Sequence, residues 1–245
     1  INVTIIENSA LYNGGGIFLM ESNPTLIDVT LNDNTGSFVG GGIFAEDSSP
    51  TLMNVTISGN SAISGGGLHL DNCTSILTNV TISENFTFDG DIGSWNKGGG
   101  GMVVIGLGNN LTMNNVMITD NSSLRNGGGI STYAGINILM RNVTITGNTA
   151  VWDGGGIYAD SGTNGLINIV NSIVNNNIQD QEGIYPETVH TFEFGYKGRI
   201  TPTIYGTMDI FRSNYSSFVS AITFITPIVL DKEVVHSGMP KKITG

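Results

Sequence analysis

The fold of this chain is decided by residues 54–67, which read NVTISGNSAISGGG. Val55 and Ile57 alternate with polar residues, and this period of two is typical of a β-strand that sends its apolar side chains to one face. A polar turn around Asn60 and a run of glycines follow the strand. The stretch therefore predicts a short strand and two corners within one compact unit.

The same unit recurs along most of the chain. Its first four residues return with small changes at positions 2, 28, 54, 79, 115, 142 and 171, in steps of 26, 26, 25, 36, 27 and 29 residues. An asparagine and a glycine cluster recur in phase with it. The asparagines are Asn8, Asn34, Asn60, Asn85, Asn121, Asn148 and Asn177, and the central glycines are Gly15, Gly41, Gly66, Gly100, Gly128 and Gly155.

We predict an all-β chain that forms a parallel β-helix, a solenoid of about seven coils with a period near 26 residues. One unit cannot bury its inner face alone, so coils about 4.8 Å apart build the core by stacking. The glycines are expected at corners that need a sharp turn, a positive φ or a close backbone approach. The asparagines suit turns because they tolerate the left-handed conformation and cap backbone groups, and stacked copies can hydrogen-bond along the rod.

The repeat divides the chain into three parts. Residues 1–178 form the β-helix, interrupted by about ten extra residues within 86–97. Residues 179–220 read as an irregular insertion, with 208–210 as a candidate last coil. Residues 221–245 read as an extended linker or the start of a further β domain, so we expect the natural protein to continue beyond Gly245.

Composition excludes several classes of protein. The chain has a formal net charge of −11, and of its nine Lys and Arg residues only Lys97, Arg125 and Arg141 precede residue 180, so the basic footprint of a nucleic-acid binder is missing. The longest near-apolar run, 218–230, is shorter than the roughly 20 residues of a bilayer-spanning helix. The single Cys73 excludes an internal disulfide and a thiolate zinc site, and we expect it to be buried.

The repeat resembles those of bacterial polymorphic outer-membrane proteins and related surface proteins, which carry a GGA-I and an F-x-x-N motif in each coil. The counterparts here are GGGI at 14–17, 40–43, 127–130 and 154–157, and ISGN at 57–60 with its copies. This resemblance implies a right-handed β-helix that is secreted or displayed on a cell surface and acts as a non-enzymatic adhesin.

Two alternatives for the function stay open. Many β-helices are polysaccharide lyases or hydrolases, which need clustered carboxylates; the column of Glu7, Asp33, Glu84 and Asp120 before the ladder asparagines is interpreted instead as a solvated turn. Outward Thr and Ser pairs such as Thr56 and Ser58 resemble the arrays of ice-binding solenoids, although Ile6, Asn32 and Met117 interrupt them.

Metal and modification sites have weaker signals. Asp89 and Asp91 faintly resemble a calcium loop without the remaining ligands, and we predict no cofactor. His69 lies between Leu68 and Leu70 and is expected to point outward. Nine N-x-S/T sequons occur; stacking would make most glycans collide, so the better acceptors are Asn72, Asn110 and Asn214, which lie outside the ladders.

We therefore expect a non-enzymatic, extracellular structural or adhesive module of a larger surface or filament protein. An open solenoid end exposes unpaired backbone groups, so copies of the chain or other surface proteins are expected to contact the rod ends. Aromatic residues in the 185–215 segment could supply lateral contacts: Tyr185, Phe192, Phe194, Tyr196, Tyr205 and Phe211. Carbohydrate is a second candidate partner.

Overall fold

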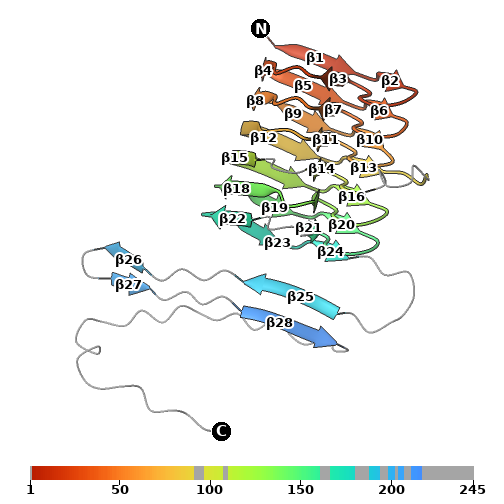
Figure 1. Ribbon diagram of the computed structural model, residues 1–245. Helices are drawn as coiled ribbons and strands as arrows, with labels where there is room; N and C mark the ends of the chain where they lie inside the picture. The colour runs from red at the N-terminus through yellow and green to blue at the C-terminus, as the bar shows by residue number, and fades with distance from the viewer. Residues whose placement is uncertain are drawn as a thin grey trace, which may run out of the picture. The chain divides into compact units, whose positions relative to one another are not determined.

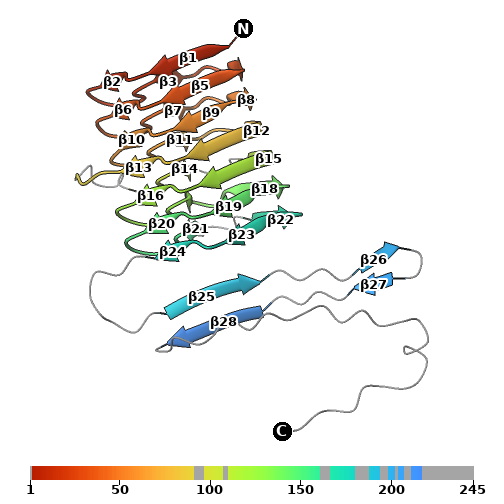
Figure 2. The same cartoon turned by 180° about the vertical axis from the view of Figure 1, so that it is seen from behind.

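The computed structural model describes residues 2–90, 97–106, 110–160 and 166–179, together with the strand backbones at 188–193, 198–201, 204–206 and 211–216. The chain divides into two compact units, Ile1–Glu182 and Gly183–Gly245. The first unit is a parallel β-solenoid whose coils stack one on another, as Figures 1 and 2 show from opposite sides. The described residues contain no helix.

Each coil contributes to three parallel sheets. Sheet B has seven strands: β2 (Ser9–Ala10), β6 (Thr35–Gly36), β10 (Ser61–Ala62), β13 (Phe86–Thr87), β16 (Ser122–Ser123), β20 (Thr149–Ala150) and β24 (Ile178–Gln179). Sheet C has six strands: β3 (Ile17–Met20), β7 (Ile43–Glu46), β11 (Leu68–Asp71), β14 (Met102–Ile105), β17 (Ile130–Tyr133) and β21 (Ile157–Asp160).

Sheet A has 11 strands because most coils cross it in two segments that meet at a corner. These are β1 (Val3–Ile6), β4 (Thr25–Ile27), β5 (Val29–Asn32), β8 (Thr51–Met53), β9 (Thr56–Ser58), β12 (Ser75–Ser83), β15 (Asn110–Thr119), β18 (Asn137–Arg141), β19 (Thr144–Thr146), β22 (Leu166–Val170) and β23 (Ile173–Asn175). The chain thus completes six turns, and β23 and β24 begin a seventh. The predicted fold class, a parallel β-helix of about this size, is confirmed.

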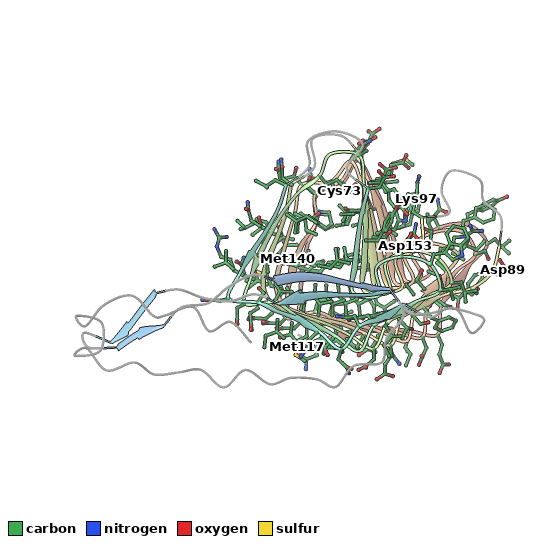
Figure 3. All side chains as sticks on the ribbon, turned by 90° about the horizontal axis from the view of Figure 1, so that it is seen from below. Cys73, Asp89, Lys97, Met117, Met140 and Asp153 are labelled. Carbon is green, nitrogen blue, oxygen red and sulfur yellow. The ribbon has the colours of Figure 1, made fainter. Side chains whose placement is uncertain are left out.

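The core consists of the predicted apolar ladders. Leu31, Ile57, Ile82, Ile118 and Ile145 pair in register from coil to coil and are all fully buried. Figure 3 looks along the rod and shows a triangular section with side chains filling its interior. Identical inward positions stack because the period of two keeps the same face of every strand toward the axis.

A lobe protrudes from one corner of this section, on the side where Asp89 is labelled in Figure 3. We use "lobe" for the described segments that join sheet B to sheet C in successive coils: residues 11–14, 37–40, 63–65, 88–90, 97–98, 124–127 and 151–154. Phe86 and Thr87 belong to the regular coil and not to the insertion predicted at 86–97, because they pair in register with Ser61 and Ala62. The stack is again in register at Met102, which pairs with Leu68.

The second unit has antiparallel rather than parallel pairs. β25 (Thr188–Glu193) pairs with β28 (Phe211–Ser216), and β26 (Gly198–Thr201) pairs with β27 (Ile204–Gly206). The candidate last coil at 208–210, the linker at 221–245 and the side chains of the six aromatic residues named above in the 185–215 segment lie outside the described residues.

Candidate functional site

The ladder asparagines form a continuous hydrogen-bonded column between sheets A and B. Asn60 shows the pattern: its backbone N–H and its Nδ2 both donate to Asn85 Oδ1, at 2.9 and 3.0 Å, and Nδ2 also donates to the Leu31 carbonyl at 3.0 Å. Asn34, Asn60, Asn85, Asn121 and Asn148 are fully buried, while Asn8 and Asn177 lie at the two ends of the column. Since buried polar groups must be paired, this column holds the corner together.

The ladder asparagines were expected to adopt the left-handed conformation, and this prediction was wrong. The residue before each of them adopts it instead. Seven residues with φ between 48° and 69° each precede a ladder asparagine: Glu7, Asp33, Gly59, Glu84, Asp120, Gly147 and Asn176. The four carboxylates of this set are exposed, as expected of a solvated turn. The ladder asparagine is free to turn its side chain inward because its neighbour makes the corner.

The glycine clusters divide the work of their corner. The first glycine of each cluster has a positive φ, for example Gly40 at 66°. At the central glycine there is no room for a side chain: a Cβ on Gly41 would collide with the carbonyl oxygens of Gly66 and Ser61. Gly15, Gly66, Gly100, Gly128 and Gly155 meet neighbouring backbone in the same way. The central glycines are therefore required by close approach between coils.

A second ladder runs along the exposed corner within sheet A. Nδ2 of Asn54, Asn79, Asn115 and Asn142 each donates to the side chain of the preceding coil, starting at Asp28, over 2.8–3.1 Å. These residues have φ near 55° and are exposed or partly exposed. Sequons begin at three residues of this exposed ladder, Asn54, Asn79 and Asn142. Two other sequons begin at Asn85 and Asn121, which belong to the buried ladder.

The candidate glycosylation sites have different surroundings. Asn72 is exposed at a left-handed corner with φ of 51°. Asn110 is exposed and accepts a hydrogen bond from Asn137 Nδ2 at 3.2 Å. The side chain of Asn214 lies outside the described residues.

His69 is fully buried, which corrects the expectation that it points outward. Its side chain points away from the solenoid core, but the lobe covers this face of sheet C. A side chain on Gly65 of the lobe would collide with His69, and Val103 and Ser131 in the same row are also fully buried. The His69 ring lies 5.5 Å from that of Phe44. Burial lowers the pKa of His69 to about 3, against a smaller opposing effect of a hydrogen bond with the Ser64 backbone.

Two further titratable groups lie where sheet C ends. Asp71 is in register with Glu46 on the neighbouring strand, and burial, followed by the charges of Glu46 and Asp47, raises the pKa of Asp71 to about 6. Cys73 is free and buried, as predicted, and its thiol donates to the carbonyls of Asp71 and Ala45 at 3.1 and 3.4 Å. Burial raises the pKa of Cys73 to about 11, so this thiol is not a reactive nucleophile.

A hollow of about 280 Å³ lies on the lobe, lined by residues 63, 87–89, 124–125 and 151–152 from four successive coils. The Arg125 guanidinium carbon lies 4.8 Å from the centroid of the Trp152 ring, within the range of a cation–π contact. Trp152 and Leu124 remain 50% and 43% exposed, so apolar surface lines this hollow. Sequence reasoning missed this hollow because its residues are unremarkable within each repeat unit.

The remaining predicted sites are scattered. Asp89 is exposed on the lobe, whereas Asp91 lies outside the described residues; no group of three or more potential metal ligands occurs in the described part of the chain. Thr30, Thr56 and Thr81 stand in register on the outer face of sheet A, and the next position is the half-exposed Met117. Among the described residues, no helix is long and apolar enough to span a bilayer.

One comparison with known proteins gives a match. Residues 142–160 match the family model of the Chlamydia polymorphic membrane protein repeat. The matched segment covers β19, β20 and β21, together with the ladder residue Asn148 and the glycine cluster at 154–156. No curated protein and no solved structure matches the chain. The chain thus carries a polymorphic membrane protein-like β-helix repeat, as its motifs indicated.

Proposed function

We propose that this chain is a non-enzymatic, extracellular β-helix module with a structural or adhesive role in a larger cell-surface protein. The observation that carries the proposal is the match of residues 142–160, part of one coil, to the polymorphic membrane protein repeat, within a stack where the other coils repeat the same ladder and corner residues. The in-phase Asn and Gly residues are all used to hold coils together, which suits a rigid spacer that presents its edges to partners.

Surface exposure is tested on intact cells of the source organism. Antibodies raised against the purified chain should bind non-permeabilised cells, and brief external protease treatment should remove the signal. An antibody signal that needs permeabilisation would overturn the proposal. Beads coated with the chain then test adhesion, since an adhesive module should retain them on cells and a purely structural one should not.

Self-association through the rod ends and the 185–215 segment belongs to the same proposal. Its partners would be copies of the chain or other surface proteins. Negative-stain electron microscopy with sedimentation velocity of the purified protein tests it. Fibres or a concentration-dependent series of oligomers would support a filament role, and a monomer at all concentrations would exclude it.

A carbohydrate-processing enzyme is the second candidate, favoured by the register of Asp71 with Glu46 and by the raised pKa of Asp71, since such pairs serve as acid and base in glycosidases. Against it, the lobe hollow contains neither residue. Incubating the chain with neutral and acidic polysaccharides, beside an Asp71→Asn variant, decides the matter: cleavage that is lost in the variant would establish the enzyme.

A further inference from the structure

We propose that the lobe hollow binds a neutral pyranoside, with Trp152 as the stacking surface and Arg125 and Asp89 as the polar contacts. The inference gives the adhesive role a class of ligand. It rests on the proposed function only for its biological setting, because binding by the purified chain is independent of where the protein is displayed.

Trp152 supplies the apolar surface. It belongs to the lobe of the sixth coil, and half of its surface stays accessible although Arg125 lies over its ring. The neighbouring Leu124 and Phe88 extend the apolar wall onto the two preceding coils. The face of the Trp152 ring that Arg125 does not cover is flat and fits the C–H face of a pyranose, which is apolar while the ring edge carries hydroxyls.

Arg125 supplies hydrogen-bond donors that are already positioned. It is one of three cations in the first 180 residues, and no carboxylate of the described residues forms an ion pair with it. The contact with Trp152 restricts the guanidinium group, so less side-chain entropy is lost when its N–H groups donate to a ligand. Lys97 also makes a cation–π contact, with its ammonium 4.4 Å from the centroid of the Tyr133 ring, but neither residue lines the hollow.

Asp89, which is exposed and lines the hollow, supplies the matching acceptor. A hydroxyl group is both a donor and an acceptor, so vicinal hydroxyls can donate to a carboxylate and accept from a guanidinium group. The carboxylate and the net charge of −11 disfavour an anionic sugar. A volume of about 280 Å³ lies at the small end of ligand sites, which fits a mono- or disaccharide rather than a long chain segment.

The test uses the intrinsic fluorescence of the full chain. The chain has two tryptophans, so a Trp95→Phe background leaves Trp152 as the reporter. The probes are methyl glycosides of glucose, galactose, mannose and N-acetylglucosamine, with galacturonate as the anionic comparison. We expect a saturable fluorescence change with one or more neutral probes, a dissociation constant on the order of 1 mM, and a weaker response to galacturonate.

The variants are Trp152→Ala and Arg125→Lys. Binding to Trp152→Ala is measured by calorimetry because this variant lacks the fluorescent reporter. Arg125→Lys keeps the positive charge and removes the planar guanidinium group. Binding should weaken at least about tenfold in the first and severalfold in the second. Tyr12→Ala, an exposed aromatic residue in the lobe of the first coil, is the matched control and should bind as the parent does. Absence of saturable binding to every neutral probe, stronger binding of galacturonate, or unchanged binding in Arg125→Lys would each overturn the site, and none of these results bears on surface exposure.

Discussion

Two asparagine ladders run along the same solenoid, and they differ in almost every physical respect. The buried ladder, which includes Asn85, pairs side-chain amides with the backbone of the neighbouring coils and excludes solvent. The exposed ladder, which includes Asn79, joins side chains to one another at a left-handed corner in water. The period of a residue therefore does not reveal its role, because burial decides how much its hydrogen bond contributes to stability.

The largest expected effect separates the two ladders directly. Asn85→Ala removes the side-chain partner of the Ile57 carbonyl and of the Asn60 backbone N–H, and it takes one of three acceptors from Asn60 Nδ2. Each buried unpaired group costs about 1–3 kcal/mol, so we expect a loss of about 3 kcal/mol or more. Denaturant unfolding followed by circular dichroism measures it.

The matched variant in the exposed ladder is Asn79→Gly, because glycine keeps the left-handed backbone without strain. It removes the bonds to Asn54 and Asn115, which water replaces, and should cost less than about 1 kcal/mol. Equal losses in the two variants would contradict the distinction between the ladders.

A second comparison sets the inside of a corner against its outside. Gly41→Ala forces a Cβ against the backbone of the next coil and should destabilise the fold by about 2–4 kcal/mol. Gly59→Asn should change stability by less than about 1 kcal/mol, since Asn176 and Asp33 occupy the same position with positive φ in other coils. Thermal unfolding of both variants measures the difference, and a tolerated Gly41→Ala would show that the coils can separate.

The pH dependence of stability distinguishes the lobe face from the edge of sheet C. The pKa of His69 falls from 6.5 to about 3 on folding. Its contribution to the free energy of unfolding is therefore complete above pH 6.5 and is lost as the pH falls toward 3. The pKa of Asp71 rises from 3.8 to about 6 on folding. Its contribution to the free energy of unfolding is therefore present below pH 3.8 and is lost as the pH rises through 6.

His69→Gln and Asp71→Asn isolate these opposing contributions. We expect His69→Gln to lose less stability than the parent between pH 6.5 and 4, and Asp71→Asn to lose less than the parent between pH 4 and 7. Guanidinium unfolding at pH 4, 5.5 and 7 measures both. A parent and a His69→Gln variant with parallel pH profiles would mean that His69 is accessible to water.

The smallest effect concerns sequon occupancy. In folded protein secreted from a glycosylating host, we expect no glycan on Asn85 or Asn121, because their amides are buried and hydrogen-bonded. Asn72 and Asn110 are exposed and remain the expected acceptors. Glycopeptide mass spectrometry decides this, and a glycan on Asn121 in folded protein would contradict its burial.

The coil could be predicted from sequence patterns alone. Alternation at Val55 and Ile57 and the in-phase recurrence of Asn60 and Gly66 were sufficient to predict the parallel stack and its inward ladders, because identical units can bury their faces only against each other. The tertiary structure alone decided what happens beyond the coil. His69 alternates like an exposed residue but is covered by a lobe, and Trp152 and Arg125 line a hollow with Asp89 from another coil. Local patterning reports which side of its own strand a residue faces, whereas burial on the outer side depends on segments that the fold brings back from elsewhere in the chain.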